Sequence, residues 1–355
     1  MIRLFRATDF RCLENAELKF GPRFNLIHGA NASGKTSLLE ALAYLGRGKS
    51  FRGASTANLV RHGQKEFVLF GELDQSIGAT TVGVRNSRDG LEVRVGGEAA
   101  SGAAALAEAL PLQVIDPEVH NLIGGGPELR RRFLDWIAFH VEHEHLGIWR
   151  RFRRALKQRN AALKAGASPA NIKSWNAEFL DLAAQLDRSR RVVLDLTMES
   201  LVEFGAGLLE TELNFEYRPG WSADRDLAEA LEAGLERDRQ LGSTQAGPHR
   251  ADIKVSYDER QARKLVSRGQ QKLLASAMIL AATETAQAAL ERPLLLLLDD
   301  PAAELDRDSI ARLMAAVSSL GCQVVATALD PASLVFSETP TVFHVEQGAV
   351  SAADG

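Results

Sequence analysis

The amino-acid sequence predicts an α/β domain that is split by a mostly helical insertion. Residues 1–125 contain apolar stretches with the pattern of β-strands, and such stretches return after residue 237. Residues 126–237 instead carry apolar residues at helical i, i+4 and i+7 spacing. The run Leu294–Leu298 contains only leucine, which is typical of a parallel strand buried on both faces of its sheet. We therefore expect segments 1–125 and 238–355 to form one domain and segment 126–237 to form an inserted helical lobe.

Length and composition narrow the class of protein. The 355 residues allow about two domains. A hydrophobic content of 45% and a charged content of 25% are average for globular chains and argue against a disordered, collagenous or membrane-embedded protein. The net charge of -4 excludes a uniformly polybasic nucleic-acid binder, so any DNA contact must come from a local patch.

Cysteine usage and the N-terminus predict a reduced, cytoplasmic protein without a membrane partner. Cys12 and Cys322 lie near opposite ends of the chain, which argues against a disulfide framework or a zinc site. The first ten residues lack the apolar core of a signal peptide. The longest aliphatic run is five residues, far too short to span a bilayer.

Local patterns give the expected elements of the outer segments. Asp89 and Gly90 mark a hairpin turn within the strand-like stretch 80–95, and a helix is expected to begin near Lys35. Further strands are predicted at 24–28, 67–73, 251–257, 294–298 and 323–327, and further helices at 269–290 and 309–319.

The strongest motif is Gly29–Thr36, which fits G-x-x-x-x-G-K-[ST] between an apolar strand and an amphipathic helix. Its glycines allow backbone N–H groups and the helix N-terminus to face phosphate oxygens. Lys35 adds a positive charge, and the hydroxyl of Thr36 is suited to Mg²⁺. The predicted nucleotide contacts in this P-loop are Gly29, Ala30, Asn31, Ala32, Ser33, Gly34, Lys35, Thr36 and Ser37.

A nucleoside triphosphate site also needs a carboxylate at the tip of a neighbouring strand. Asp299 directly follows the leucine run and is predicted to hold the metal together with Thr36. Asp300 follows it, where a second carboxylate could orient the attacking water. We therefore predict Lys35, Asp299 and Asp300 as catalytic residues, although GTPases, many ATPases and small-molecule kinases share these motifs.

Two further segments indicate a particular superfamily. Residues 266–272, about thirty residues before the acidic strand, resemble the ABC ATPase signature, and residues 303–306 resemble its D-loop. In that superfamily the signature of one subunit closes over the γ-phosphate held by the other, which implies a nucleotide-bridged homodimer. The residues that this resemblance adds to the nucleotide site are Ser267, Gly269 and Gln270, acting in trans, and Asp306.

Over its whole length the chain resembles the RecF family of bacterial recombination mediator ATPases, small relatives of the SMC heads. The matching stretches are Phe10-Arg11, Leu39-Glu40-Ala41, Ser50-Phe51-Arg52, Pro127–Asp135, Lys157–Asn160 and Gly247–Asp252. The resemblance implies an ABC-type P-loop ATPase head, ATP and Mg²⁺ as cofactors, and ATP-driven head-to-head dimerisation on DNA that slow hydrolysis resets. It further implies recombinational repair and replication-gap processing, with single-stranded, gapped or duplex DNA and mediator proteins such as RecR and RecO as partners.

The same resemblance places Arg11 near the nucleotide, although a solvated arginine at a strand end is the alternative. Ala32 stands where SMC-like P-loops often have glycine, and its Cβ excludes much of the φ range of glycine, which puts nucleotide affinity in question. Ala251 replaces a usual acid, and Ala303 replaces a usual serine and lacks a hydroxyl that could bond across the dimer. No switch histidine is evident after residues 323–326, so Thr327 is a candidate by position only.

The insertion begins with a surplus of positive charge. Residues 126–160 contain nine Lys or Arg against four acids, a surplus of five. These side chains could neutralise DNA phosphates, but a solvated helix face, with some arginines paired to acids, is the alternative. The insertion is short and interrupted around 166–169, so we expect a compact lobe rather than a long coiled coil.

Two other function classes share part of this pattern. A transport subunit that powers a membrane partner would carry the P-loop, the signature and the acids. The missing switch histidine, the helical insertion and its basic start argue against it. A small-molecule kinase would leave residues 267–270 without a role.

Overall fold

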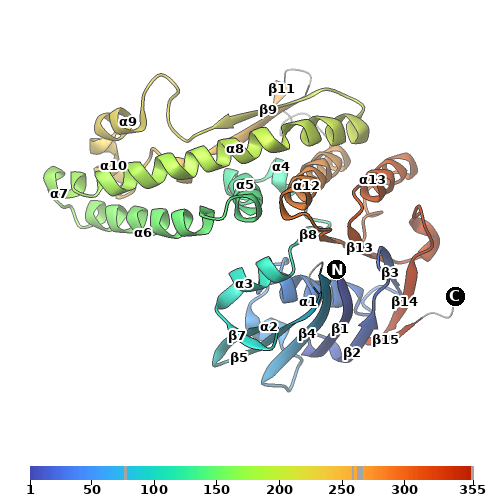
Figure 1. Cartoon of the computed structure of the whole chain (residues 1–355). Coiled ribbons are helices and arrows are strands. Elements are labelled where there is room, and N and C mark those ends of the chain that lie inside the picture. The colour runs from blue at the N-terminus through green and yellow to red at the C-terminus, as the bar shows by residue number, and fades with distance from the viewer. Residues whose placement is uncertain (76–77, 258–259, 262–266, 353–355) are drawn as a thin grey trace. The chain divides into compact units, whose positions relative to one another are not determined.

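The computed structural model describes residues 1–75, 78–257, 260–261 and 267–352, and the chain forms two compact units (Figure 1). The outer unit consists of Met1–Val119 and Arg268–Gly355, and the inserted unit consists of His120–Ser267. The expected boundaries at residues 125 and 238 are therefore wrong. Segment 238–267 belongs to the inserted unit because its strand 252–257 pairs with strand 213–218 and because Asp238 is buried against Arg159.

One sheet of the outer unit is mostly parallel and confirms the prediction from the leucine run. Its order is β15-β14-β3-β13-β12-β8, and neighbours from β14 to β8 are parallel. All four residues of β12 are buried, as expected of a strand covered on both faces. The strands are β3 (Phe24–His28), β8 (Leu112–Ile115), β12 (Leu295–Leu298), β13 (Gln323–Ala328), β14 (Thr341–Glu346) and β15 (Ala349–Ala352).

The other sheet of the outer unit is antiparallel, in the order β2-β1-β4-β5-β6-β7. The predicted turn is confirmed, because β5 and β6 form a hairpin in which Ser87 pairs with Gly90. Its strands are β1 (Ile2–Phe10), β2 (Leu13–Lys19), β4 (Glu66–Gln75), β5 (Gly78–Ser87), β6 (Gly90–Val95) and β7 (Glu98–Ala100).

Helix α1 (Lys35–Arg47) joins the two sheets into one core. It contacts strands of both sheets, and its leucines are fully buried. Gly48 ends the helix in the left-handed conformation, with its N–H bonded to the carbonyl of Tyr44. The remaining helices of this unit are α2 (Thr56–Leu59), α3 (Gly102–Ala109), α12 (Arg268–Leu290), α13 (Arg307–Ser319) and the 3₁₀ turn η2 (Pro331–Ser333).

Within the described residues, α12 is the one helix long and apolar enough to cross a membrane by length and composition. Of its most apolar window, 61% is buried in the protein, and the core helix of a soluble protein passes the same test.

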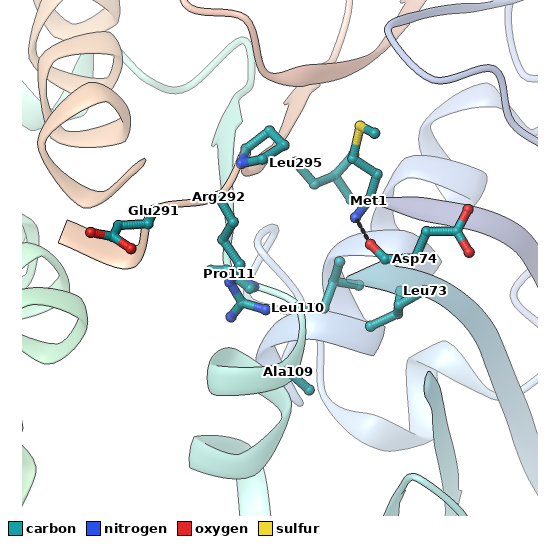
Figure 2. Close-up of a pocket in the computed structure, with 10 residues that line it drawn as sticks. Met1, Leu73, Asp74, Ala109, Leu110, Pro111, Glu291, Arg292 and Leu295 are labelled. Atoms are coloured by element: carbon teal, nitrogen blue, oxygen red, sulfur yellow. Dashed lines mark hydrogen bonds between the residues drawn. The ribbon is translucent and has the colours of Figure 1, made fainter. Parts of the chain in front are cut away.

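The N-terminal ammonium donates to the carbonyl of Asp74 at 2.7 Å, beside a pocket of about 280 Å³ (Figure 2). Residues of β4, α3, β12 and neighbouring loops line this pocket.

The inserted unit is mostly helical but also carries a three-stranded sheet, β11-β10-β9, that the sequence did not reveal as one element. The expected interruption around residues 166–169 is confirmed, because α6 ends at Lys164 and the next helix begins at Pro169. Its elements are α4 (Asn121–Gly124), α5 (Pro127–Val141), α6 (His145–Lys164), α7 (Pro169–Lys173), α8 (Asn176–Leu209), β9 (Leu213–Arg218), α9 (Leu227–Ala233), α10 (Leu235–Leu241), η1 (Pro248–Arg250), β10 (Asp252–Tyr257) and β11 (Arg260–Gln261).

Candidate nucleotide site

The P-loop connects the end of β3 to the start of α1. Lys35 Nζ donates to the carbonyl oxygens of Gly29, at 2.6 Å, and Ala30, at 2.8 Å, so the ammonium lies across the loop. Burial lowers the pKa of Lys35, while Asp300 and Asp299 act in the opposite direction. The structure therefore brings the P-loop lysine within electrostatic range of both predicted acids.

Close packing explains the glycines of the loop. A Cβ on Gly29 would lie 2.2 Å from the carbonyl oxygen of Val345, and Gly34 has a φ of 118°. Ser33 is buried, and its carbonyl oxygen accepts a bond from Gly348 at 2.8 Å. The loop thus rests against the β14–β15 hairpin, which fixes the path of its backbone.

Ala32 adopts a φ of 62°, in the left-handed region that glycine occupies at no steric cost. For an L-residue this conformation costs about 1–2 kcal/mol. The departure from glycine noted in the sequence is therefore a strained position within the loop.

Asp299 lies directly beyond β12 and is almost fully buried. It accepts hydrogen bonds from the hydroxyls of Thr36, at 3.0 Å, and Thr327, at 2.9 Å. Burial raises the pKa of Asp299, while these two hydrogen bonds and the charge of Arg52 lower it. The two predicted metal ligands, Thr36 and Asp299, therefore meet although 263 positions separate them in the sequence.

Asp300 has a different environment from its neighbour. It is exposed, its φ is 47°, and its backbone N–H donates to the Thr327 hydroxyl at 2.9 Å. Thr327 is buried at the end of β13, which is parallel to β12 and hydrogen-bonded to it. Thr327, a candidate by position alone, thus contacts both acids.

Asp116 is a further carboxylate that the sequence reasoning missed. It follows β8 as Asp299 follows β12, and burial together with the charge of Asp299 raises its pKa to about 6. The missed signal was the same as for Asp299, an acid directly after a short apolar strand. The carboxyl ends of two neighbouring strands therefore each carry an acid.

Arg11 is held by α1. Its guanidinium donates to both carboxylate oxygens of Glu40, at 2.5 and 2.9 Å, and the Ser50 hydroxyl bonds to the same carboxylate. Glu40 is fully buried, so three stretches that matched the family in sequence meet at one carboxylate. A contact of Arg11 with nucleotide stays a prediction, because the observed partner of its side chain is Glu40.

Residues 268–272 of the signature lie together with the D-loop, residues 303–306, in the outer unit. Gly269 and Gln270 belong to the first turn of α12, and Lys272 Nζ donates to the carbonyl of Ala303 at 2.6 Å. Asp306 caps α13 through both carboxylate oxygens, which accept from the backbone N–H of Ser309 at 2.8 Å and from its hydroxyl at 2.9 Å. Ser267 is the last residue of the inserted unit, and Val266 lies outside the described residues.

Comparison with known proteins identifies the family. A family model described as RecF/RecN/SMC N terminal domain matches residues 1–351. A protein of Shewanella baltica named DNA replication and repair protein RecF is 39% identical over 347 residues, which cover 96% of each chain. The chain belongs to the RecF family. A second RecF, from Pseudomonas aeruginosa, is 39% identical over 352 residues, which cover 97% of this chain and 95% of that protein.

Solved structures agree with the RecF assignment. A structure described as the recombination mediator protein RecF-ATP in the RecFOR pathway has a TM-score of 0.89 at 24% identity, covering 99% of this chain and 97% of that chain. An SMC head bound to the C-winged helix domain of ScpA has a TM-score of 0.61 at 14% identity, covering 99% and 96%. These likenesses confirm the predicted ABC-type head with an insertion, and membership of the RecF family disfavours the transporter alternative.

The basic start of the RecF insertion separates into two groups. Arg130 is buried, pairs with Asp252 and donates to three backbone carbonyls, while Arg159 is fully buried against Asp238. Arg131 donates to the carbonyl of Ala251, and Arg132 pairs with Glu128. Three of these arginines are thus paired with acids, as the alternative expected, whereas Arg131 bonds to a backbone carbonyl. The other five cations lie on α6 and are exposed: Arg150, Arg151, Arg153, Arg154 and Lys157.

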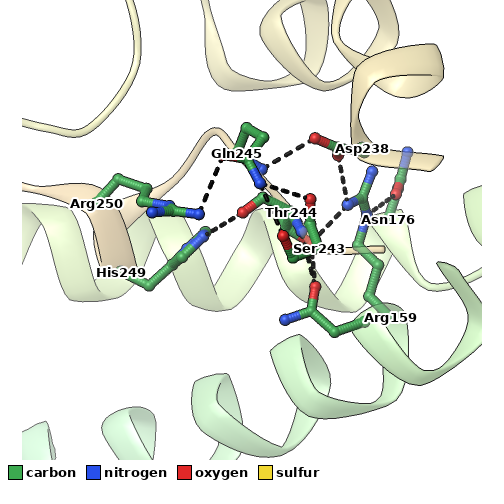
Figure 3. A network of polar contacts seen from close by, with 9 residues as sticks. Arg159, Asn176, Asp238, Ser243, Thr244, Gln245, His249 and Arg250 are labelled. Carbon is green, nitrogen blue, oxygen red and sulfur yellow. Dashed lines mark hydrogen bonds and ion pairs between the residues drawn. The ribbon is translucent and has the colours of Figure 1, made fainter. Parts of the chain in front are cut away.

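Two family-matching stretches of the RecF insertion also meet (Figure 3). Arg159 donates to Asp238 at 2.8 Å and to the Thr244 hydroxyl at 2.6 Å, and Asn160 accepts from the same hydroxyl at 2.7 Å. The ring of His249 bonds to the Thr244 carbonyl at 2.9 Å. Thr244 thus joins stretch 157–160 to stretch 247–252.

Proposed function

We propose that this RecF-family chain is a cytoplasmic ATPase that binds DNA, requires Mg²⁺ and acts in recombinational repair and replication-gap processing. The observation that carries the proposal is the contact between the Thr36 hydroxyl and the Asp299 carboxylate. It joins the last P-loop residue to the acid at the tip of a neighbouring parallel strand, which is the arrangement that P-loop enzymes use for nucleotide and metal.

The residues at this point fit Mg²⁺. The ion prefers oxygen ligands and usually takes one or two carboxylates together with substrate phosphates. Asp299 supplies a carboxylate and Thr36 a hydroxyl, while the P-loop amides and Lys35 would hold the phosphates. When bound, Mg²⁺ would neutralise charge on the β- and γ-phosphate oxygens.

Asp300 is the acid best suited to orient the attacking water. It is exposed, whereas Asp299 is buried and already accepts two hydroxyl bonds. The Thr327 hydroxyl fixes the backbone of Asp300 next to Asp299, and this backbone carries the exposed carboxylate. Catalysis would then depend on placing a water in line with the γ-phosphate and on the positive charge of Lys35.

ATP-dependent dimerisation is the proposed switch. The first turn of α12, with Gly269 and Gln270, would meet the nucleotide of a second copy, together with Ser267. Hydrolysis would then separate the two copies. A solved relative is described as part of the RecFOR pathway, which supports RecR and RecO as partner proteins.

Helix α6 supports the DNA-binding part of the proposal. Six exposed cations lie along it: Arg150, Arg151, Arg153, Arg154, Lys157 and Lys164. Within the described part of the chain these six form no ion pair, and most of them line a shallow groove along the helix. From residue 150 to residue 164 the cations extend over roughly 21 Å at 1.5 Å per residue. Cations without acid partners are free to neutralise phosphates and release counterions.

The test is ATP hydrolysis with and without gapped, duplex and single-stranded DNA over a salt series. Replacement of Arg150, Arg153 and Lys157 by Gln should abolish stimulation by DNA and leave the DNA-free rate unchanged. The dependence of log K on log salt should weaken by roughly 0.9 for each phosphate that the variant no longer neutralises. The matched control removes three paired surface arginines of the outer unit, Arg3, Arg6 and Arg85. A wild type that no DNA stimulates or binds at low salt would contradict the proposal.

A further inference from the structure

Lys272 is a lysine buried inside the outer unit. Its side chain is among the largest fully buried ones, with 1% of the residue exposed. It lies in the first turns of α12, three residues after Gly269, and its ammonium donates to the carbonyl of Ala303 at 2.6 Å. A lysine is rarely buried this deeply unless its charge is compensated.

The compensation comes from acids of the candidate nucleotide site. Burial lowers the pKa of Lys272, while Asp300 opposes this most strongly, followed by Glu304, Asp116 and Asp299. These acids follow two neighbouring strands, β8 and β12, or belong to the turn 300–304. The ammonium is thus the internal counter-charge of the carboxylates that would surround nucleotide and metal.

The turn that Lys272 contacts is strained. Asp300 has a φ of 47° and Glu304 a φ of 67°, and neither is glycine. Such conformations persist only where surrounding contacts hold them. The backbone N–H of Ala303 donates to the Asp300 carbonyl at 3.0 Å, and Lys272 holds the carbonyl of the same residue.

Two more contacts connect the start of α12 to this turn. Gly269 packs so closely that a Cβ there would lie 3.3 Å from the Glu304 carbonyl oxygen. Arg268 forms an exposed ion pair with Glu304 at 3.6 Å. A displacement of the first turn of α12 would therefore change the turn that begins with Asp300.

We propose that Lys272 is a positioning residue for ATP hydrolysis that couples the signature end of α12 to Asp300 of the same chain. This inference rests on the proposed function. When the nucleotide of a second copy engages the first turn of α12, Lys272 transmits that engagement through the Ala303 carbonyl to the turn 300–304. The rate of hydrolysis at each active site then depends on whether the other site holds ATP, so hydrolysis is cooperative.

The main test compares Lys272→Met, which removes the charge at similar volume, with Lys272→Arg, which retains it. We expect Lys272→Met to bind ATP and to dimerise on ATP within about twofold of wild type. Its kcat should fall at least tenfold, and the Hill coefficient for ATP should fall to one. Lys272→Arg should recover part of kcat and of the cooperativity. Thr283→Val, a buried change on the same helix whose hydroxyl bonds only within α12, is the matched control and should leave kcat unchanged.

A second variant keeps the test decisive if Lys272→Met does not fold. Arg268→Gln removes an exposed ion pair, a change that stability tolerates. We expect it to lower kcat and the Hill coefficient by a smaller factor without loss of ATP binding. Unchanged kcat and unchanged cooperativity in a folded Lys272→Met, or in Arg268→Gln, would overturn the inference while leaving the proposed ATPase intact. A wild type that neither binds nor hydrolyses ATP would instead overturn the proposed function.

Discussion

The hydroxyl of Thr327 donates to the Asp299 carboxylate at 2.9 Å, and the same oxygen accepts the backbone N–H of Asp300 at 2.9 Å. One buried side chain at the end of β13 therefore fixes the two acids that follow β12. Because β12 and β13 are parallel with Leu298 beside Ala326, the residue after Ala326 necessarily lies next to the residue after Leu298. The sheet register thus creates this contact.

Loss of the Thr327 hydroxyl should impair hydrolysis more than binding. A hydrogen bond to a charged group contributes about 1.5–3 kcal/mol, so we expect Thr327→Val to lower kcat by about tenfold or more. Thr327→Ser keeps the hydroxyl and should stay within about threefold of wild type. Single-turnover hydrolysis and equilibrium ATP binding measure the two effects separately. An equal loss of kcat in both variants would contradict the role of the hydroxyl.

Glycine in place of Ala32 should stabilise the P-loop. The left-handed conformation costs alanine about 1–2 kcal/mol, and glycine brings an entropic cost of about 0.5–1 kcal/mol, so Ala32→Gly should raise the free energy of unfolding by about 0.5–1 kcal/mol. ATP affinity should rise in the same direction. Ala30→Gly is the control, because Ala30 is not among the described residues with positive φ and glycine there brings only the entropic cost. Denaturant unfolding compares the two, and equal effects would exclude strain at Ala32.

Removal of the Glu40 charge should destabilise the outer unit. Arg11 is 24% exposed, which reduces the cost below that of a fully buried pair, and we expect Glu40→Gln to lower the free energy of unfolding by about 2 kcal/mol. Glu17→Gln removes a partner from the exposed pair with Arg6 and should cost less than about 0.5 kcal/mol. Urea unfolding at neutral pH measures both. Equal losses in the two variants would show that the Arg11–Glu40 pair contributes no more to the free energy of unfolding than an exposed ion pair does.

His249 should make the protein less stable in acid. Burial lowers its pKa from 6.5 to about 4, so the folded protein binds fewer protons than the unfolded chain between these values. The free energy of unfolding therefore falls as the pH drops below about 6.5, by about 2 kcal/mol between pH 7 and pH 5. His249→Gln should remove this part of the pH dependence. Unfolding of both proteins across that pH range isolates the difference, and parallel curves would contradict it.

Local sequence patterns were sufficient to predict much of the fold. The leucine run predicted β12 as a buried parallel strand, and the P-loop spacing predicted the start of α1 at Lys35. The division into units was less accurate, because it depends on pairing between residues far apart. The sequence pattern of strand 252–257 is compatible with either unit. Only its pairing with Leu213–Arg218 assigns it to the inserted unit.

Local motifs likewise predicted only the part of the candidate site whose residues lie in short sequence patterns. Thr36, Asp299 and Asp300 follow from local motifs, and the structure brings the first two into contact. Lys272 and Glu40 are buried charges whose partners, Ala303 and Arg11, are distant in sequence, so no local pattern reveals them. Asp306 also caps α13, a role that the sequence analysis did not predict, and its contact with nucleotide stays a prediction.

The most direct test of the account is the molar mass of the protein in solution with and without Mg²⁺ and ATP, for wild type and for Ser267→Arg. If the signature acts in trans, ATP should raise the mass of wild type from one chain to two, and Ser267→Arg should remain a single chain while still binding ATP. A Ser267→Arg variant that dimerises on ATP as well as wild type, or a wild type whose mass does not respond to ATP, would contradict the central claim.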